Sequence, residues 1–507
     1  MDNRLFSRRN FLKAGFQLGA GASLSLLLAD RLVANPLARV LGVLDPLRTV
    51  RVRGTVTSGK TPLAGIAVTD GRSVARTDVQ GRYELLADAS RPFVYLSLPA
   101  GQRIPQNPGQ ATARFYAPLS TEKPEWTHNW VLEPLPQSDA NHRFYVFADP
   151  QPRTADDLKL YHTETIADAR AFHASLPPQE TFAVGCGDIM WDDLTLLPGY
   201  EAAMRDLAVP AFSVVGNHDL DMQDVRTDEA SVRTFERFFG PTYYSFDRGE
   251  VHYVVLDNVF WYGRSAAGAY MGYLDELQLG WLKQDLQGLP AGKTVVVFTH
   301  IPIYCHINRY KGQDEEGSIV TVNRALLYEL LRPFKTHFIN GHMHWTEQHT
   351  DGGFTHHTCG AACGAWWSGP ICYDGTPSGY GVYEVTGSSF RWAYKGTGLP
   401  LEQQLRLYAP GADPKAPHEL VANVWSATPD WQIVWYEDGI RKGRMAARIG
   451  HDPLSVQLHE GNKLPTKHTW VDPEPNNHLY YAPVAAGAAQ VRVEATDPWG
   501  RVYTAAL

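Results

Sequence analysis

The stretch Ala211-Phe212-Ser213-Val214-Val215-Gly216-Asn217-His218-Asp219 joins a short apolar run to a group of polar side chains. The apolar run predicts a buried strand. An amide, an imidazole and a carboxylate follow it directly, so they lie where the strand ends. Loops that leave the carboxyl ends of strands in a layered α/β sheet meet in one crevice. This stretch therefore predicts both the class of fold and the place of a site.

Four other apolar runs in the chain end in polar segments of the same kind. The runs are Phe144–Ala148, Thr181–Gly185, Thr294–Thr299 and Thr336–Asn340, and the segments that follow them are Asp149-Pro150-Gln151, Gly187-Asp188, His300 and Gly341-His342-Met343-His344. Each segment alone is a weak signal, because Gly-Asp pairs and single histidines usually mark turns. Five in this order supply enough oxygen and imidazole ligands for two metal ions.

The order and residue types resemble the calcineurin-like metallophosphoesterase superfamily. The pattern of that superfamily is Asp-x-His, Gly-Asp, Gly-Asn-His-Asp/Glu, His and Gly-His-x-His, and four of its five blocks match this sequence residue for residue. The resemblance covers about half of the chain, and it implies a four-layer αββα core over residues 140–398. It also implies a metal-dependent phosphoric ester hydrolase, either a phosphatase or a phosphodiesterase.

Matching by position assigns a role to each polar residue of the five segments. The resemblance implies that one metal is held by Asp149, Gln151, Asp188 and His344, and the second by Asp188, Asn217, His300 and His342. Asp188 then bridges two cations, and water between them attacks phosphorus as hydroxide. His218 is left free as general acid near the leaving group, with Asp219 orienting its ring.

Gln151 departs from the superfamily pattern, because most members have histidine there. A carboxamide ligates through its carbonyl oxygen, but it is neutral and less basic than imidazole. We therefore expect two divalent or trivalent ions, with Mn or Fe favoured and Zn possible. Some members of the superfamily that carry Asp-Pro-Gln in this place are phosphatases, so the change does not imply a dead enzyme.

The N-terminus reads Ser7-Arg8-Arg9-Asn10-Phe11-Leu12-Lys13, followed by a moderately apolar run to Ala29. This resembles a twin-arginine export signal, which predicts a signal peptide over residues 1–38 and a periplasmic or secreted protein. The apolar run is too short and too interrupted for a membrane span, so none is expected after the signal is removed.

The formal net charge of the chain is −8, and residues 1–38 carry five Lys/Arg against two Asp, which leaves the remainder near −11. No basic run lies outside the leader, so nucleic acid is not expected as a partner, and a small phosphate ester is. The five cysteines are too few for a disulfide scaffold. Three of them, Cys359, Cys363 and Cys372, follow the last ligand block and leave open one disulfide or a third metal site.

The length of 507 residues suggests three domains. Alternating strands with Asp/Gly turns predict a transthyretin-like or carboxypeptidase-regulatory-like β-domain at 48–135, either a scaffold or a carbohydrate binder, and a β-sandwich at 409–507. In the central domain, the span Tyr273–Leu286 shows a helical period, and Tyr243–Asp247 with His252–Asp257 predicts a hairpin. The fold class is thus α/β, a four-layer αββα core flanked by two small all-β sandwich domains.

Aromatic residues near the ligand segments suggest substrate contacts. The residues are Tyr304, Trp345, Trp366, Trp367 and Tyr380. Their rings are suited to stacking on a sugar or base or to lining a slot for the leaving group, but packing between domains explains them equally well. His306 is expected near the pocket with Tyr304, and at most one of His356 and His357 should face inward.

These observations predict an exported phosphoesterase with a binuclear metal centre, which hydrolyses a phosphomonoester or phosphodiester by metal-bound hydroxide. The alternative is a non-catalytic envelope protein with glycan-binding β-modules and a relic phosphoesterase core. The presence of His218 beside nearly all the ligands of the pattern favours the enzyme.

Overall fold

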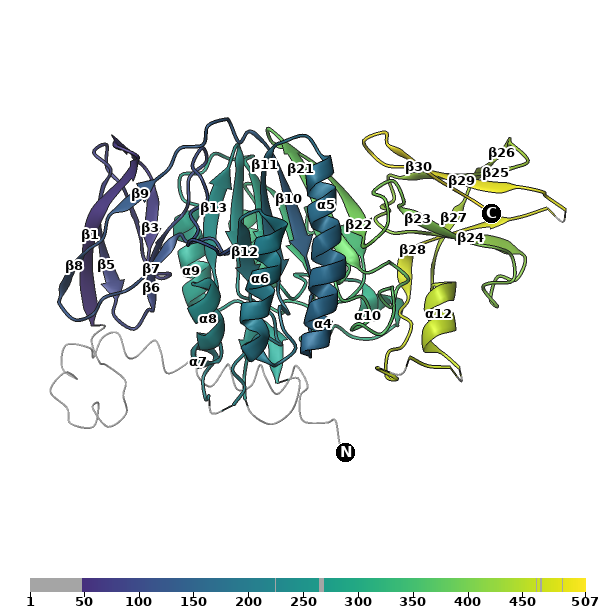
Figure 1. The fold of residues 1–507 in the computed structure, drawn as a ribbon, viewed down its shortest axis with the longest axis horizontal. Coiled ribbons are helices and arrows are strands. Elements are labelled where there is room, and N and C mark those ends of the chain that lie inside the picture. Colours follow the sequence, from purple (N-terminus) through teal and green to yellow (C-terminus); the bar gives the residue numbers. More distant parts are fainter. Residues whose placement is uncertain (1–47, 224, 264–268, 462, 466, 486) are drawn as a thin grey trace.

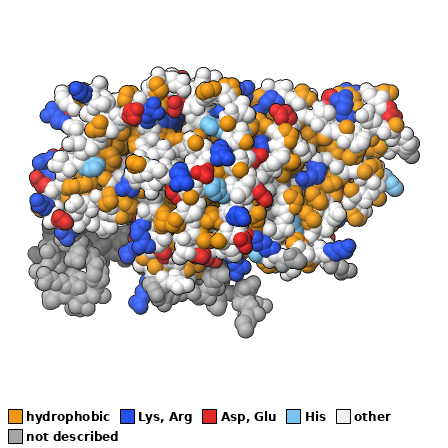
Figure 2. Space-filling model, in the orientation of Figure 1, with side chains coloured by type: hydrophobic (Ala, Val, Ile, Leu, Met, Phe, Trp, Pro, Cys, Tyr) orange, Lys and Arg blue, Asp and Glu red, His pale blue; other side chains and the backbone are white. Residues whose placement is uncertain are grey.

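A computed structural model describes residues 48–223, 225–263, 269–461, 463–465, 467–485 and 487–507. The predicted signal peptide, residues 1–38, lies outside the described residues. The chain forms three parts in a row, a β-rich N-terminal part, a central α/β part and a β-rich C-terminal part (Figure 1). On the face shown in Figure 2, Lys and Arg side chains are interspersed with Asp and Glu side chains. Within the described ranges, no helix is both long and apolar enough to cross a bilayer.

The N-terminal part packs two sheets face to face around the inward side chains of β1 (Thr49–Ser58). Its first sheet contains β1 with β2, β5, β8 and β9 (Thr61–Pro62, Arg82–Asp88, Glu125–Thr127 and Trp130–Leu132). Its second sheet has the order β4-β3-β6-β7 (Val74–Arg76, Ala67–Thr69, Phe93–Leu96 and Tyr116–Pro118). Val50, Val52 and Val56 of β1 are buried, as the two-residue period of a strand predicts.

The central part is built on two sheets. The first has the order β12-β11-β10-β21-β22 (Ala211–Val214, Glu180–Cys186, Asn141–Phe147, Gly379–Thr386 and Ser389–Gly396). The second has the order β13-β14-β17-β18-β20-β19 (Tyr244–Arg248, Val251–Val255, Thr294–Phe298, Lys335–Asn340, Phe354–Thr358 and Glu347–Asp351). The five apolar runs that lead to the polar segments are therefore strands β10, β11, β12, β17 and β18, as the sequence predicts.

Helices cover the outer faces of both sheets (Figure 1). The first sheet is covered by α4, a π-helical turn, α5 and α6 (Ala155–Leu160, Tyr161–Ile166, Ala167–Ser175 and Leu197–Leu207). The second is covered by α9 and α11 (Glu276–Asp285 and Arg324–Leu331). Alternate residues of β10 show the layering, because Phe144 and Val146 pack between the sheets while Tyr145 and Phe147 pack under the helices. The prediction of an αββα core is confirmed.

Two local predictions in the core are also confirmed. Helix α9 lies inside the span Tyr273–Leu286, and Asp275 caps it by accepting a hydrogen bond from the backbone N–H of Gln278. Strands β13 and β14 form an antiparallel hairpin in which Arg248 faces Val251 across a two-residue turn. Gly249 takes a positive φ of 52° in that turn, as tight hairpin turns require.

The remaining short elements of the central part surround these layers. They are a 3-10 turn, α7, α8, β15, β16 and α10 (Leu194–Leu196, Asp228–Ser231, Arg233–Phe239, Val259–Trp261, Tyr270–Gly272 and Ile307–Tyr310).

The C-terminal part contains two four-stranded sheets around a separate apolar core. One has the order β23-β24-β28-β27 (Leu405–Tyr408, Glu419–Val424, Asn476–Pro483 and Ala446–Gly450), and the other β26-β25-β29-β30 (Ile440–Arg444, Gln432–Glu437, Val491–Thr496 and Val502–Ala506). Helix α12 (Pro453–His459) precedes a long connection to β28. Part of that connection reaches the site described below.

Candidate metal centre

The seven predicted metal ligands gather at the carboxyl edge of the two central sheets. Five of the seven have a positive φ: Asp149, Gln151, Asp188, His342 and His344, at 47°, 41°, 47°, 70° and 48°. Side-chain-bearing residues adopt this left-handed region at a cost, and such residues cluster at functional sites. The surrounding strands therefore hold these side chains inward against a local preference of the backbone.

Two glycines of the motifs allow the loops to pack on the buried carboxylates. A Cβ atom on Gly216 would lie 1.9 Å from the backbone nitrogen of Asp188, and one on Gly341 would lie 2.5 Å from Oδ2 of Asp149. Neither position admits a side chain without moving a ligand. This close approach explains why glycine precedes both Asn217 and His342.

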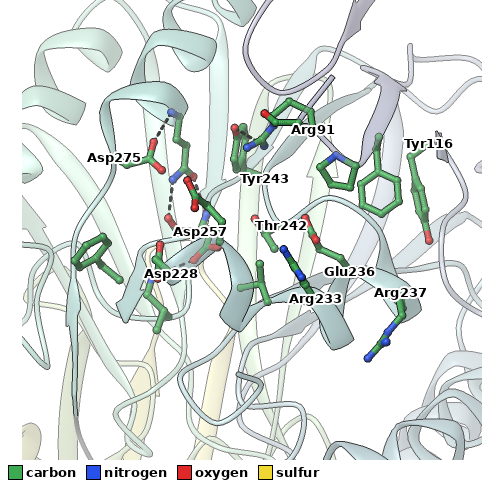
Figure 3. A pocket seen from close by; sticks show the side chains of 18 of the residues that line it. Arg91, Tyr116, Asp228, Arg233, Glu236, Arg237, Thr242, Tyr243, Asp257 and Asp275 are labelled. Atoms are coloured by element: carbon green, nitrogen blue, oxygen red, sulfur yellow. Dashed lines mark hydrogen bonds between the residues drawn. The ribbon is translucent and has the colours of Figure 1, made fainter. Parts of the chain in front are cut away.

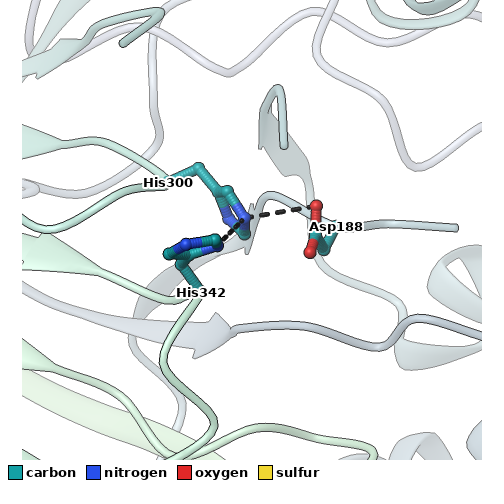
Figure 4. Close-up of side chains that lie close together, drawn as sticks. All are labelled: Asp188, His300 and His342. Atoms are coloured by element: carbon teal, nitrogen blue, oxygen red, sulfur yellow. Dashed lines mark hydrogen bonds and ion pairs between the residues drawn. The ribbon is translucent and has the colours of Figure 1, made fainter. Parts of the chain in front are cut away.

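Four ligands converge on one point, and Figure 4 shows three of them, Asp188, His300 and His342, pointing toward one another. The Nε2 atom of His300 lies 3.2 Å from Oδ1 of Asp188 and 3.1 Å from Oδ1 of Asn217. The Nδ1 atom of His342 lies 3.2 Å from the same Nε2 atom. One nitrogen of each imidazole and one oxygen from each of the other two side chains thus face a common centre.

Backbone carbonyls fix the tautomer of each histidine ligand. His300 Nδ1 lies 3.0 Å from the carbonyl oxygen of Cys186, His342 Nε2 lies 2.9 Å from that of Ser318, and His344 Nδ1 lies 2.8 Å from that of Gly364. A carbonyl only accepts, so each of these nitrogens carries the hydrogen. The opposite nitrogen of each ring is left to face the centre, which is the usual arrangement around a bound metal.

Burial keeps two of these rings in the neutral, ligating form. It lowers the pKa of His342 to about 3 and that of His344 to about 4. Burial also raises the pKa of Asp149 well above its usual range, whereas at Asp188 burial is outweighed by His300 and His218 together, and the pKa is lowered. Two buried carboxylates this close together call for cationic partners.

The other group of ligands surrounds Asp149. Its Oδ1 atom lies 3.6 Å from Nε2 of His344, and both of its oxygens accept from the backbone N–H of His342. Gln151 places its amide nitrogen 3.2 Å from Oδ2 of Asp188, while its buried Oε1 atom has no hydrogen-bond partner among the described residues. Turning the amide over aims that oxygen at the space beside Asp188, and the two orientations of an amide are chosen from its surroundings.

The predicted partnership between His218 and Asp219 is wrong. The carboxylate of Asp219 accepts hydrogen bonds from the backbone N–H groups of Ile189, Met190 and Gly216, at 3.1, 2.9 and 2.9 Å. The carboxylate of Asp219 therefore holds the loops of Asp188 and Asn217 together, and it does not contact the His218 ring. Burial raises the pKa of Asp219 to about 7.

The partner of the His218 ring is Asp192. Its Oδ1 atom lies 2.7 Å from Nδ1 of His218, and Asp192 itself has a φ of 61°. Burial alone would lower the pKa of His218, but the carboxylates of Asp188 and Asp192 outweigh it and raise that pKa. Asp192 lies four residues after Asp188 in the same loop, and this closeness in sequence to a ligand is the signal that could have identified it as the partner of His218.

Two of the five predicted substrate-contacting aromatics lie at the centre. The ring of Trp366 stacks on His344 with centroids 4.1 Å apart, and Trp367 donates from Nε1 to the carbonyl oxygen of Pro150 at 3.0 Å. Both tryptophans have positive φ, at 51° and 59°. Their rings therefore belong to the wall of the ligand cluster.

The structure places the other three aromatics in contacts outside the ligand cluster. Tyr380 is fully buried and donates to Asp168 on α5, so it belongs to the core under the helices. Trp345 is 6% exposed and packs in a small cluster with Cys305 and Ile307. Tyr304 packs on His349 and beneath Arg324, and its neighbour His306 also faces His349. Distance along the chain from a ligand did not reveal which way these rings turn.

The connection between α12 and β28 adds aromatic residues that the sequence did not indicate. Trp470, 52% exposed, lies 4.6 Å from the ring of Trp366, and His468 lies 5.3 Å from the ring of Trp191. Trp191 in turn lies 5.6 Å from His218. These four residues, Trp191, Trp366, His468 and Trp470, form an aromatic rim beside the centre, and the C-terminal part supplies half of it.

Two further predictions concern the histidines and cysteines around the ligand blocks. His356 stacks on Phe338 under the helices, while His357 contacts Tyr383 between the sheets, so the two alternate as expected. All five cysteines are buried and free, so the structure shows no disulfide among Cys359, Cys363 and Cys372.

A cavity of about 790 Å³ lies away from the centre, between the N-terminal part and the core (Figure 3). Its labelled side chains mix arginines with carboxylates, among them Arg91, Arg233, Glu236 and Asp257. None of the seven predicted ligands lines it. Cavity size therefore does not mark the chemistry of this protein.

Comparison with known proteins gives three family matches along the chain. Residues 50–135 match the N terminal of calcineurin-like phosphoesterase, residues 142–346 match calcineurin-like phosphoesterase, and residues 356–503 match the C terminal of calcineurin-like phosphoesterase. These ranges together span most of the chain and include all seven predicted ligands.

Several curated proteins are similar to part of the chain. The chain is 33% identical to serine/threonine-protein phosphatase CPPED1 of Bos taurus over 25% of this chain and 42% of that protein, and 32% identical to purple acid phosphatase 23 of Arabidopsis thaliana over 28% of this chain and 29% of that protein. The chain thus spans less than two thirds of the length of either relative. Among solved structures, purple acid phosphatase PPD1 from yellow lupin (Lupinus luteus) seeds is 13% identical, with a TM-score of 0.37 over 70% of this chain and 68% of that one. A likeness of that size carries no functional argument.

Proposed function

The chain belongs to the calcineurin-like phosphoesterases, a family of metal-dependent phosphoric ester hydrolases, and from this premise we propose that it hydrolyses a small phosphate ester at a centre of two metal ions. The observation that carries the proposal is the facing pair of imidazole nitrogens, His300 Nε2 and His342 Nδ1, 3.2 Å apart. Each ring gives its other nitrogen to a backbone carbonyl, so these two facing nitrogens are the ones left for a ligand. A cation between them would be coordinated by both rings.

The donor set fits the metals that the family uses. Asp149, Gln151, Asp188 and His344 would hold one ion, and Asp188, Asn217, His300 and His342 the other. The unpartnered oxygen of Gln151 gains a role as a ligand in this arrangement. When bound, two such ions acidify a water molecule and draw charge from the phosphoryl oxygens. We favour Mn or Fe over Zn, because one ligand position holds a carboxamide in place of an imidazole.

The protein groups around the ions have separate tasks. Asp192 fixes the His218 ring through Nδ1, which leaves Nε2 free to give a proton to the leaving oxygen. The raised pKa of His218 keeps that proton available near neutral pH. The aromatic rim gives the leaving group a flat surface beside His218. The charges interspersed on the face shown in Figure 2 support a small substrate over a polyanion.

Hydrolysis of aryl phosphates tests this function. Protein reconstituted with Mn²⁺ or Fe should release 4-nitrophenol from 4-nitrophenyl phosphate or its bis-ester, and chelation should stop the release. Activity with one ester and not the other would assign the protein to phosphatases or phosphodiesterases. If folded, metal-replete protein cleaved neither ester, the alternative hypothesis of a non-catalytic envelope protein with glycan-binding β-modules would replace this proposal.

The Trp470→Ala variant tests the aromatic rim. Losing one aromatic contact of about 0.5–1.5 kcal/mol should raise KM for an aryl phosphate roughly 2- to 10-fold and leave kcat near the wild-type value. Trp499→Ala is the matched control, because that tryptophan packs on Trp392, 4.4 Å away and outside the rim. Equal KM values for wild type and Trp470→Ala would remove the rim from substrate binding.

We further propose that the twin-arginine segment exports the protein folded and already loaded with metal. Loading before export suits a site that must take Mn or Fe, since affinity order alone favours copper and zinc. Cell fractionation should find the wild-type chain in the periplasm or medium, and the Arg8→Lys/Arg9→Lys variant in the cytoplasm. An unchanged distribution would refute the proposed route.

A further inference from the structure

A second group of metal-ligating side chains lies outside the centre described above. His306 follows β17 in the loop that begins at His300, and Glu347 and His349 stand on the edge strand β19. One ligand atom from each of the three lies within 4.8 Å of the other two. We call these three residues, His306, Glu347 and His349, the edge cluster.

The local structure explains why the three side chains meet. Glu347 and His349 are two positions apart on β19, so they project from the same face of the strand. His306 stands just before α10 (Ile307–Tyr310) and approaches Glu347 twice, through its backbone N–H at 3.3 Å and its Nδ1 atom at 3.0 Å. Tyr310, one turn further on, donates from its hydroxyl to Oε1 of Glu347 at 3.1 Å.

The buried ring of His349 lacks the polar partners that an ion pair would give it. Its side chain is 6% exposed, yet neither ring nitrogen has a hydrogen-bond partner among the described residues. The nearest carboxylate oxygen, Oε2 of Glu347, lies 3.8 Å from Nδ1, which is too far for a hydrogen bond. Leaving such a buried polar group unpaired costs about 1–3 kcal/mol.

The neighbouring rings hold His349 without satisfying it. His356 stacks on it face to face at 4.8 Å, and His306 meets it edge-on at 4.4 Å. Burial lowers the pKa of His349 to about 4, so the ring is neutral and keeps a free lone pair. A neutral imidazole fixed by stacking beside a second imidazole and a carboxylate is the donor set of a transition-metal site.

We propose that the edge cluster binds one divalent cation of the zinc class, through one nitrogen each of His306 and His349 and the carboxylate of Glu347. The atom separations of 3.0 and 3.8 Å around Glu347 are close to those between ligands that share a metal at about 2.0–2.2 Å. Two imidazoles and one carboxylate suit Zn²⁺, Co²⁺ or Ni²⁺ better than Mn²⁺. Three protein ligands leave a further position for water, and the Tyr310 hydroxyl lies 3.1 Å from the ligand oxygen Oε1 of Glu347.

An ion in the edge cluster would join two segments that carry ligands of the main centre. The His306 loop starts at His300, and β19 starts three residues after His344. Binding would therefore brace both segments from outside the phosphate site. This role needs no change in the proposed hydrolysis, and the two inferences stand or fall separately.

Zinc content of the dialysed, Zn²⁺-reconstituted protein tests the proposal. We expect one more ion per chain in the wild type than in His349→Gln or in His306→Gln. His162→Gln is the matched control, since His162 also pairs with a carboxylate, Asp206 at 2.8 Å, but belongs to no group of three ligand side chains among the described residues. The His162→Gln variant should bind as much zinc as the wild type. The Asp188→Asn variant should lose zinc from the main centre only and keep the ion of the edge cluster.

Anomalous diffraction at the zinc edge from wild-type crystals of the same dialysed protein makes the test independent of the variants' folding. A peak about 2.0–2.2 Å from the three side chains is expected. Equal zinc counts in wild type and both edge-cluster variants, or no peak at these residues, would overturn the proposal.

Discussion

Replacing Asp188 with Asn should abolish phosphate ester hydrolysis. Asp188 is the one predicted ligand shared by both metals, and its oxygens lie 3.2 Å from His300 Nε2 and 3.2 Å from the Gln151 amide. The charge of a bridging carboxylate offsets the repulsion between two cations, and their stabilisation of the transition state is worth several kcal/mol. We therefore expect a loss in kcat/KM on the order of 10³-fold or more in assays with excess metal.

Asp193→Asn is the matched control for this variant. Asp193 lies in the same loop, but its carboxylate is exposed and only accepts from Thr195, at 3.1 Å from the backbone N–H. Its replacement should leave hydrolysis within about twofold of the wild type, as expected for a surface change of at most about 0.5 kcal/mol. If Asp188→Asn retained wild-type kcat/KM, the shared-carboxylate account would fail.

Replacing His218 with Ala should lower kcat by about 10²–10⁴-fold, the usual contribution of a positioned acid. The ring is not one of the seven ligands, so the metal content of the variant should equal that of the wild type. Esters with good leaving groups, such as 4-nitrophenyl phosphate, need protonation less and should show the smaller loss. Loss of bound metal together with activity would instead make His218 a ligand.

The Asp192→Asn variant should move the pH profile in a defined direction. The carboxylate of Asp192 helps to raise the pKa of His218, so the acid form persists to higher pH in the wild type. Activity that depends on this proton falls as the pH rises through that pKa. Without the carboxylate the pKa drops, and the alkaline limb of kcat should shift to lower pH. If the alkaline limb of kcat were unchanged in Asp192→Asn, His218 would not be the group whose titration sets that limb.

The strands and the metal ligands were predictable because both follow from local sequence. Each apolar run is short, β-branched or aromatic, and directly followed by its ligand, as in Thr294–Phe298 before His300. Parallel strands bring their carboxyl ends to one edge of a sheet, so the approach of Asp149 to the Asp188 loop follows from the neighbouring strands β10 and β11. The approach of His342, which follows a strand of the other sheet, also requires the two sheets to pack together. The positive φ values at five of the ligands could not be predicted, because the motifs give residue types and not backbone conformation.

The roles of side chains around the ligands were less predictable, because they depend on where each loop turns. Asp219 follows His218 directly, yet its carboxylate turns back to the N–H groups of the Asp188 loop. Tyr380 lies on β21, and neighbouring residues of a strand point to opposite faces of the sheet, so position in the sequence alone did not show which way its ring turns. The approach of Trp470 required packing of a separate domain, which no local pattern expresses.

The most direct test of the central claim is anomalous diffraction from crystals of the wild-type protein reconstituted with Mn²⁺. The account predicts two peaks about 3.5–4 Å apart with Asp188 between them, one beside Asp149 and His344 and the other beside His300 and His342. A single peak at these residues, or none in fully reconstituted protein, would contradict it.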